Sequence, residues 1–307
     1  MTMTMTTTPT MKTTPTGNMA SRDFYKVRSY SGCAGAAFNL LCSNFATIFK
    51  KTWLYAAVLS LIYGLYAFVS FPALTVENGS VDFQPWLIAL AETAVLVLCL
   101  IVANSRTKAG LLTLITGDGI KAMFGKHLKV SLILTGIGIA VTIAVMGASI
   151  LTAHCLLTHN VQPETADTAV LCIFAVAGVT TLCLFLPFAY SATRHLLNDS
   201  RTREIFGHHY RTGLKYFGFL FVIAIIIALV LMVAALFSAL PAFITTLASS
   251  VDRFGVENGD ATGLPSYFHW LSFLTNTVVG FVMTYIIFWI DLTFCYAYGT
   301  IHEGSEL

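Results

Sequence analysis

The sequence predicts an all-α, polytopic membrane protein with six transmembrane helices, which form three helical hairpins with cytosolic amphipathic segments before them. Three observations predict this fold. The 307 residues are 56% hydrophobic and only 10% charged, whereas soluble domains carry roughly 25% charged residues. Six apolar runs are each long enough to cross a hydrocarbon core of roughly 30 Å. The basic residues, finally, gather in alternate loops between these runs.

The chain divides into four parts by composition. Residues 1–25 are rich in Thr, Met and Pro and hold no apolar run, which predicts a disordered tail rather than a secretory signal peptide. Residues 26–52 form a cytosolic amphipathic segment, residues 53–300 a six-span membrane domain, and residues 301–307 a short cytosolic tail.

The amphipathic segment contains apolar residues at the spacing of one helix face. Phe38, Leu41, Phe45 and Ile48 follow one another at three- and four-residue intervals. This spacing predicts a helix over Phe38–Lys51 that lies flat in the membrane interface. A short helix that packs on the aqueous side of the bundle is the alternative.

The six spans follow in order, and aromatic residues lie near several of their ends, as is typical of the membrane interface. Pro241 is expected to end the fifth span, because proline lacks the N–H group that a helix interior needs. The predicted spans are Trp53–Leu74, Trp86–Ala103, Leu128–Ala153, Ala169–Ser191, Tyr216–Leu240 and Trp270–Ala297.

The distribution of Lys and Arg predicts the orientation. Sixteen of the 17 basic residues lie before the first span or in the loops over 104–129 and 192–215, and only Arg253 lies in an alternate loop. Cytosolic loops carry the excess of basic residues, so both termini are expected in the cytosol. The expected location is the cell membrane, specifically a bacterial inner membrane.

A stretch of the chain recurs. Ser105–Lys129 aligns without gaps on Ser191–Lys215, 86 positions later, with six identities and three close replacements, among them Lys108 on Arg194. Each copy precedes a span, which indicates an internal duplication. The alternative is that any helix that leads into a span needs an aromatic residue and a Lys.

Three polar residues inside the predicted spans are candidates for function. Glu92 lies in the second span, and an acid within a span is costly enough to mark a functional site by default. Asp291 lies late in the sixth span, where it could reach the cytosolic headgroups. Asn276, in the same span, is a candidate hydrogen-bonding residue between helices. For each of the three, a structural role is the alternative.

The basic residues that flank the spans are candidate contacts for anionic lipid headgroups. Their position beside the spans favours lipid over nucleic acid as a partner. The candidate headgroup contacts are Lys50, Lys51, Lys126, Lys129, Arg211 and Lys215.

No catalytic, cofactor-binding or metal-binding motif occurs in the sequence, and the eight His residues form no HExxH pattern. We therefore expect no cofactor and no enzymatic activity.

The chain resembles the uncharacterised six-span bacterial inner-membrane proteins that are related to the membrane domain of some glycerophosphodiester phosphodiesterases. The resemblance rests on the aromatic and basic residues before the first span, Asn44-Phe45 and Phe49-Lys50-Lys51-Thr52-Trp53, and on the three-hairpin plan. It covers roughly residues 30–300. No hydrolase domain accompanies these residues, so the resemblance implies neither phosphodiesterase activity nor a functional residue.

Two functions compete at this point. The first is a non-enzymatic membrane module that organises lipid or protein partners, a homo-oligomer included, which the repeated basic segments favour. The second is a permease for a small solute, proton-coupled through Glu92, which the repeat and the intramembrane acid favour. A lipid-modifying enzyme is a third and weaker alternative, because no catalytic constellation is visible.

Overall fold

The structure is a computed structural model. It describes residues 24–65, 76–77, 80–81, 84–158, 162–198, 202–260 and 263–306.

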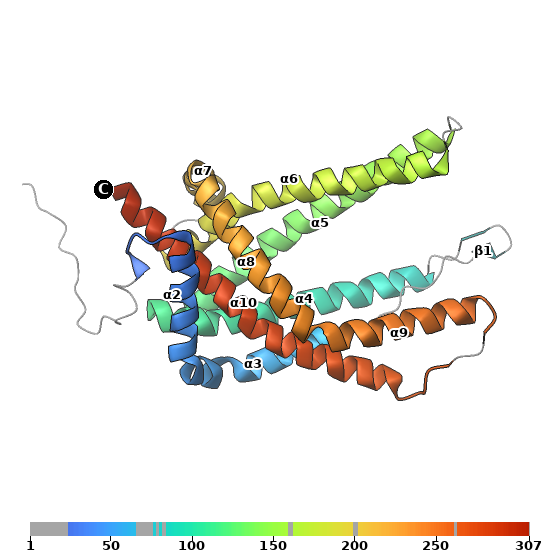
Figure 1. Ribbon diagram of the computed structural model, residues 1–307, viewed down its shortest axis with the longest axis horizontal. Coiled ribbons are helices and arrows are strands. Elements are labelled where there is room, and N and C mark those ends of the chain that lie inside the picture. Colours follow the sequence, from blue (N-terminus) through green and yellow to red (C-terminus); the bar gives the residue numbers. More distant parts are fainter. Residues whose placement is uncertain are drawn as a thin grey trace, which may run out of the picture.

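Long helices make up nearly all of the described chain (Figure 1). One antiparallel pair of two-residue strands, β1 (Val76–Glu77) and β2 (Ser80–Val81), is the exception. The helices are α2 (Tyr30–Ser43), α3 (Phe45–Leu65), α4 (Gln84–Thr116), α5 (Ile120–Thr158), α6 (Pro163–Leu197), η2 (Thr202–Phe206), α7 (His208–Lys215), α8 (Phe217–Ser238), α9 (Leu240–Glu257) and α10 (Phe268–Glu306).

The six-span, all-α prediction is confirmed. Six of these helices are long and apolar enough to cross a membrane, and each overlaps one of the six predicted runs. Residues 66–74 of the first predicted run lie outside the described residues. Consecutive spans pair as α3 with α4 and α5 with α6. In the third pair, α9 joins α8 to α10, and Pro241 occupies the first turn of α9 just beyond the end of α8. The chain is therefore an integral membrane protein of the multi-pass kind.

Several helices continue past the predicted ends of the spans. The predicted second span stops at Ala103, but α4 runs on to Thr116, and α10 runs from the predicted end at Ala297 to Glu306. The predicted C-terminal tail is thus helical as far as it is described. These extensions bring polar residues that the sequence assigned to loops onto the helices of the bundle.

The predicted amphipathic helix over Phe38–Lys51 is wrong in its boundaries. The chain turns at Asn44, which separates α2 from α3. Asn44 is the C-cap of α2, and its side-chain amide donates to the Leu40 carbonyl at 3.1 Å. Such a side-chain bond gives the backbone an alternative to a continuing helix. Residues 45–51 are therefore the first turns of the first span. α2 ends before them and runs across α10 (Figure 1).

The packed core lies at one end of the bundle, which we call the basic end. It comprises α2, α7, the turn between α4 and α5, and the C-terminal part of α10 (Figure 1). Leu111, Met123, Leu220 and Tyr298 come from four helices and are each at most 1% exposed in one core cluster. Away from this end, α5 and α6 diverge from α4, α9 and α10 (Figure 1).

α10 is the helix on which the others pack. Within the most apolar stretch of each span, 44% of the residues of α10 are buried, against 6% in each of α4, α5 and α6. It contacts α2, α3, α6, α8 and α9. Residues on α10 near the basic end are therefore the ones that several helices can surround.

The N-terminal boundary of the folded part also differs from the prediction. Residues 1–23 of the predicted tail lie outside the described residues. Phe24 is 4% exposed and stacks on Tyr296 with ring centroids 4.4 Å apart, and Tyr25 packs edge-on against Tyr298. The end of the predicted tail therefore belongs to the core of the basic end.

Candidate functional site

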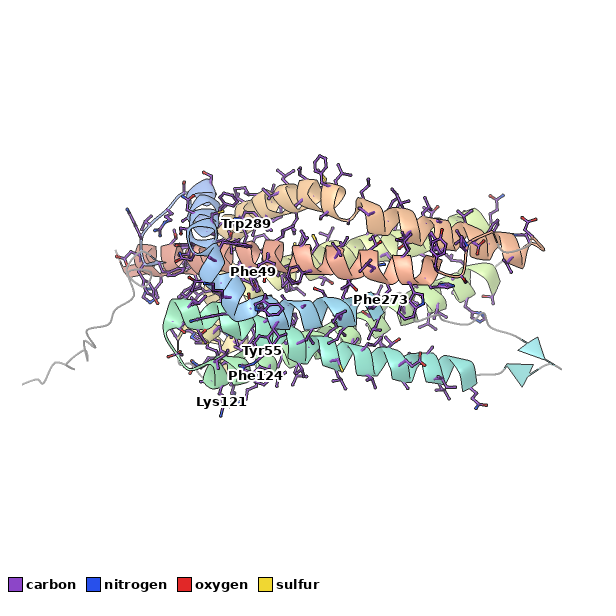
Figure 2. The ribbon with its side chains drawn as sticks, turned by 90° about the horizontal axis from the view of Figure 1, so that it is seen from below. Phe49, Tyr55, Lys121, Phe124, Phe273 and Trp289 are labelled. Carbon is purple, nitrogen blue, oxygen red and sulfur yellow. The ribbon has the colours of Figure 1, made fainter. Side chains whose placement is uncertain are left out.

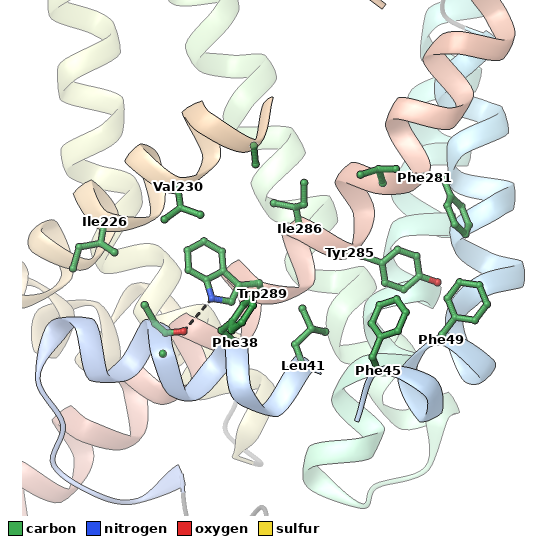
Figure 3. Close-up of a pocket in the computed structure, with 14 residues that line it drawn as sticks. Phe38, Leu41, Phe45, Phe49, Ile226, Val230, Phe281, Tyr285, Ile286 and Trp289 are labelled. Atoms are coloured by element: carbon green, nitrogen blue, oxygen red, sulfur yellow. Dashed lines mark hydrogen bonds between the residues drawn. The ribbon is translucent and has the colours of Figure 1, made fainter. Parts of the chain in front are cut away.

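Two concave features stand out in the described structure, and both lie near the basic end. The first is an apolar groove of about 700 Å³ between α2, α3, α8 and α10 (Figure 3). Ligand sites are typically concave, mostly apolar and roughly 300–1,000 Å³ in volume. The side chains that line the groove include Phe38, Leu41, Phe45, Phe49, Ile226, Val230, Phe281, Tyr285, Ile286 and Trp289.

Aromatic contacts hold the walls of the groove in place. The Tyr285 ring lies 5.6 Å from that of Phe45 and 5.7 Å from that of Phe49, and the pair with Phe49 is stacked. On the opposite wall, the indole N–H of Trp289 donates to the Ala34 carbonyl on α2 at 3.0 Å. α10 is thus tied to α3 by stacked rings and to α2 by a hydrogen bond, and the groove lies between these ties (Figure 3).

The side chains predicted to form one face of a helix divide between the groove and the core. Leu41 and Ile48 are buried at 8% and 3% exposure, whereas Phe38 and Phe45 are exposed. Each of α2 and α3 contributes one buried and one exposed side chain, so the four residues do not form a single helix face. The exposed Phe38 and Phe45 both line the groove.

Exposed basic residues lie at the same end of the molecule. Lys50 and Lys51 follow Phe49 on the first turns of α3 and are exposed, and Figure 2 shows Phe49 and Trp289 close to α2. Lys129, Arg211 and Lys215 are also exposed. Lys126 is half-buried and lies 3.9 Å from Asp118. The six predicted headgroup contacts are therefore accessible to different degrees.

The second concave feature lies between α4, α5, α6 and α10 and contains a cluster of polar groups. Lys108 on α4 donates to the Oδ1 atom of Asp291 on α10 at 2.9 Å, and the two side chains are 19% and 27% exposed. Next to this ion pair, the Nδ1 atom of His127 lies 3.2 Å from the Ser105 hydroxyl and 3.1 Å from the Ser131 hydroxyl. These polar groups join α4 to α5 and α10.

Two cavities border these polar groups. A cavity of about 300 Å³ is lined by both members of the ion pair together with His127, Ser131 and Thr193. A second cavity, of about 510 Å³, lies between α3, α4, α5 and α10. The two cavities share four lining residues, which are Asn104, Ser131, Leu134 and Ile287.

The three intramembrane candidates have different surroundings. Asp291 belongs to the ion pair and lines the smaller cavity. Glu92 is exposed on α4 and lines neither cavity nor the groove. The amide of Asn276 donates to the Ser272 carbonyl at 2.8 Å, within its own helix. Only Asp291 is thus placed where it could act on a ligand inside the bundle.

The structure shows two polar site residues that the sequence did not single out, Lys108 and His127. The signal for Lys108 was its place in the repeat, where it aligns with Arg194. It was assigned to a loop because the apolar run stops before it. The repeat also places Ser105 and Ser191 alike, since both side chains are 0% exposed.

No group of three or more His, Cys, Asp or Glu side chains suited to a metal ion occurs in the part of the chain that the structure describes. Comparison with protein-family models, with curated proteins and with solved structures found no match to this chain.

Proposed function

We propose that this protein is a non-enzymatic membrane module that holds a phospholipid at its basic end. The acyl chain of the lipid occupies the groove between α2, α3, α8 and α10, and exposed lysines contact the anionic headgroup of the lipid. The observation that carries the proposal is the groove itself, a concave surface of about 700 Å³ whose lining is aliphatic and aromatic. In a protein that crosses a bilayer, the abundant molecule of matching chemistry is an acyl chain.

Charge favours an anionic headgroup. Lys50 and Lys51 are exposed beside Phe49, a residue of the groove. A basic residue close to an anionic membrane surface contributes about 1 kcal/mol of attraction. The lysine stems can lie along apolar surface while their ammonium groups reach the phosphates. The same residues suit the predicted contact with the cytosolic leaflet.

The experiment tests this proposal by filling the groove with a larger side chain. Gly35 lines it, and a side chain there would meet no other atom within 4 Å of its Cβ position, so Gly35→Leu adds bulk to the groove without a clash. The control is Gly138→Leu, because Gly138 is an exposed helical glycine of α5 with equally open surroundings. Lipid that co-purifies with the full chain from mixed phosphatidylglycerol and phosphatidylethanolamine nanodiscs is measured by mass spectrometry.

We expect wild type and Gly138→Leu to retain phospholipid through delipidating detergent washes, and Gly35→Leu to lose most of it. Lys50→Gln with Lys51→Gln should reduce the excess of phosphatidylglycerol over phosphatidylethanolamine among the retained lipids. Equal retention by Gly35→Leu and Gly138→Leu would overturn the assignment of the groove to an acyl chain.

A further inference from the structure

We infer that the two cavities beside Lys108 and Asp291 form a second ligand site, for a single-chain amphiphile whose head carries an ammonium and a phosphate. This site is lined largely by α4, α5 and α10, whereas the proposed lipid groove lies between α2, α3, α8 and α10, so the inference goes beyond the proposed function.

Unused hydrogen-bonding capacity marks the polar end of this site. The Oδ2 atom of Asp291 is buried and has no hydrogen-bond partner among the described residues. Lys108 makes one described hydrogen bond, to Oδ1 of the same carboxylate, although an ammonium carries three N–H groups. Buried polar atoms are nearly always satisfied, because leaving one bare costs about 1–3 kcal/mol. A ligand donor at Oδ2 and a ligand acceptor at Lys108 would supply the missing partners.

The charge balance of the site favours a zwitterionic head. Lys108 and Asp291 together are neutral and are both mostly buried. A purely anionic or purely cationic head would add an uncompensated charge to this partly desolvated place, which is costly. A head with one ammonium and one phosphate keeps the total at zero. Its ammonium would bind Asp291 Oδ2 and its phosphate would bind Lys108.

The shape of the space favours a tail. The smaller cavity, about 300 Å³, is lined by the ion pair, His127 and Thr193. It shares Asn104 and Ser131 with the larger cavity of about 510 Å³, so the two cavities lie side by side. The walls of the larger cavity are mainly apolar and include Leu59, Leu100, Val279 and Met283. Both cavities are lined mainly by apolar side chains and the ion pair lies in the smaller one, which matches a small head at the ion pair with one hydrocarbon tail beside it.

The probe is lysophosphatidylethanolamine, added to the full chain in phosphatidylglycerol nanodiscs, with binding followed by native mass spectrometry. Lysophosphatidylglycerol has a comparable tail but lacks the ammonium, and free phosphoethanolamine has the head but lacks the tail. We expect the first probe to bind at least tenfold more tightly than either comparator. Equal binding of the two lysolipids would overturn the zwitterionic head, and equal binding of phosphoethanolamine would overturn the amphiphile.

Two variants localise the binding. Asp291→Asn keeps the shape and removes the charge that faces the ammonium, so its affinity for lysophosphatidylethanolamine should fall at least tenfold. Leu134→Trp adds bulk at a residue that lines both cavities without changing a charge, and should also abolish binding. It provides the second test if Asp291→Asn does not fold. Unchanged affinity in either folded variant would overturn the site. Gly35→Leu should bind this probe like wild type, which separates the site from the groove.

Discussion

The indole N–H of Trp289 donates to the backbone carbonyl of Ala34 at 3.0 Å, which fastens α10 to α2 at one wall of the apolar groove. Trp289 is only 7% exposed and belongs to the main core cluster. The same side chain thus supports the core on one side and shapes the groove on the other.

Replacing Trp289 should separate these two contributions. Trp289→Phe removes the donor and keeps most of the ring, so we expect a loss of about 0.5–1.5 kcal/mol, the usual net value of one hydrogen bond. Trp289→Ala also removes the buried ring and should cost about 3–5 kcal/mol. Thermal unfolding of the purified protein in detergent measures both losses. Equal stability of Trp289→Phe and wild type would show that the bond to Ala34 contributes nothing.

Any side chain at Gly299 in α10 should destabilise the protein. A Cβ atom at this position would overlap the carbonyl of Phe24, which is backbone and can move only if the N-terminal segment leaves its place on Tyr296. Gly299→Ala should therefore cost about 1–3 kcal/mol, the usual range for overpacking. Gly304 is the matched control, because it lies in the same helix with nothing within 4 Å of its Cβ position.

Gly304→Ala should be neutral or stabilising by up to about 1 kcal/mol, since Ala favours a helix over Gly. Limited proteolysis gives a second readout of the same pair. Cleavage near Tyr25 should accelerate in Gly299→Ala and stay at the wild-type rate in Gly304→Ala. The opposite order would contradict the docking of the N-terminal segment on α10.

The pH dependence of stability should include a contribution from His209, which lies on α7 outside the spans and is 5% exposed. Burial, followed by the positive charge of Arg194, lowers the pKa of His209 from its ordinary 6.5, while Glu204 at 3.7 Å opposes this shift. The unfolded chain then binds the proton more tightly than the folded one. The contribution is complete above pH 6.5 and is lost as the pH falls below that value.

The check is a series of thermal unfolding curves from pH 7.5 to pH 5. His209→Gln should flatten the fall in melting temperature on acidification. His208→Gln should leave it close to wild type, because His208 is exposed. A wild-type slope in His209→Gln would show that another group, such as the neighbouring His195, is responsible.

The orientation predicted from basic residues can be tested by reporter fusions. Fusions at Val81, Pro163 and Asn258 should report the outer side, and fusions at Gly119 and Arg203 the cytosol. The structure places Gly119 in the turn between α4 and α5, and Arg203 in η2 directly before α7, at the basic end. A reversal at any one of these sites would contradict the six-span topology with both termini inside.

The sequence could predict the spans because hydropathy over a membrane-length window is a property of each segment by itself. It could not predict the turn at Asn44, because the apolar spacing from Phe38 to Ile48 runs through it without interruption. It found Asp291 as a polar residue in an apolar run. Its partner Lys108 became visible only in three dimensions, since the pairing requires α4 to remain helical beyond Ala103 and to meet α10.

Glu92 is a charged residue within a span that has no partner in the described structure. The sequence marked it as a candidate functional residue because an acid within a span is costly. In the structure Glu92 is exposed on α4 and makes no hydrogen bond or ion pair with any residue that the structure describes. Glu92→Leu should therefore leave no partner unsatisfied, and should remove an acid whose cost within a span is on the order of 2 kcal/mol.

We expect Glu92→Leu to melt at or above the wild-type temperature in detergent, with Glu92→Gln between the two. The matched comparison is Asp291→Leu, which leaves the Lys108 ammonium without its partner and should be destabilised by about 3–5 kcal/mol. If Glu92→Leu instead lowers the free energy of unfolding by more than about 1 kcal/mol, the carboxylate has a partner outside the single chain. Since the exposed face of α4 is available to a second copy, the oligomeric state of wild type and Glu92→Leu would then be compared directly.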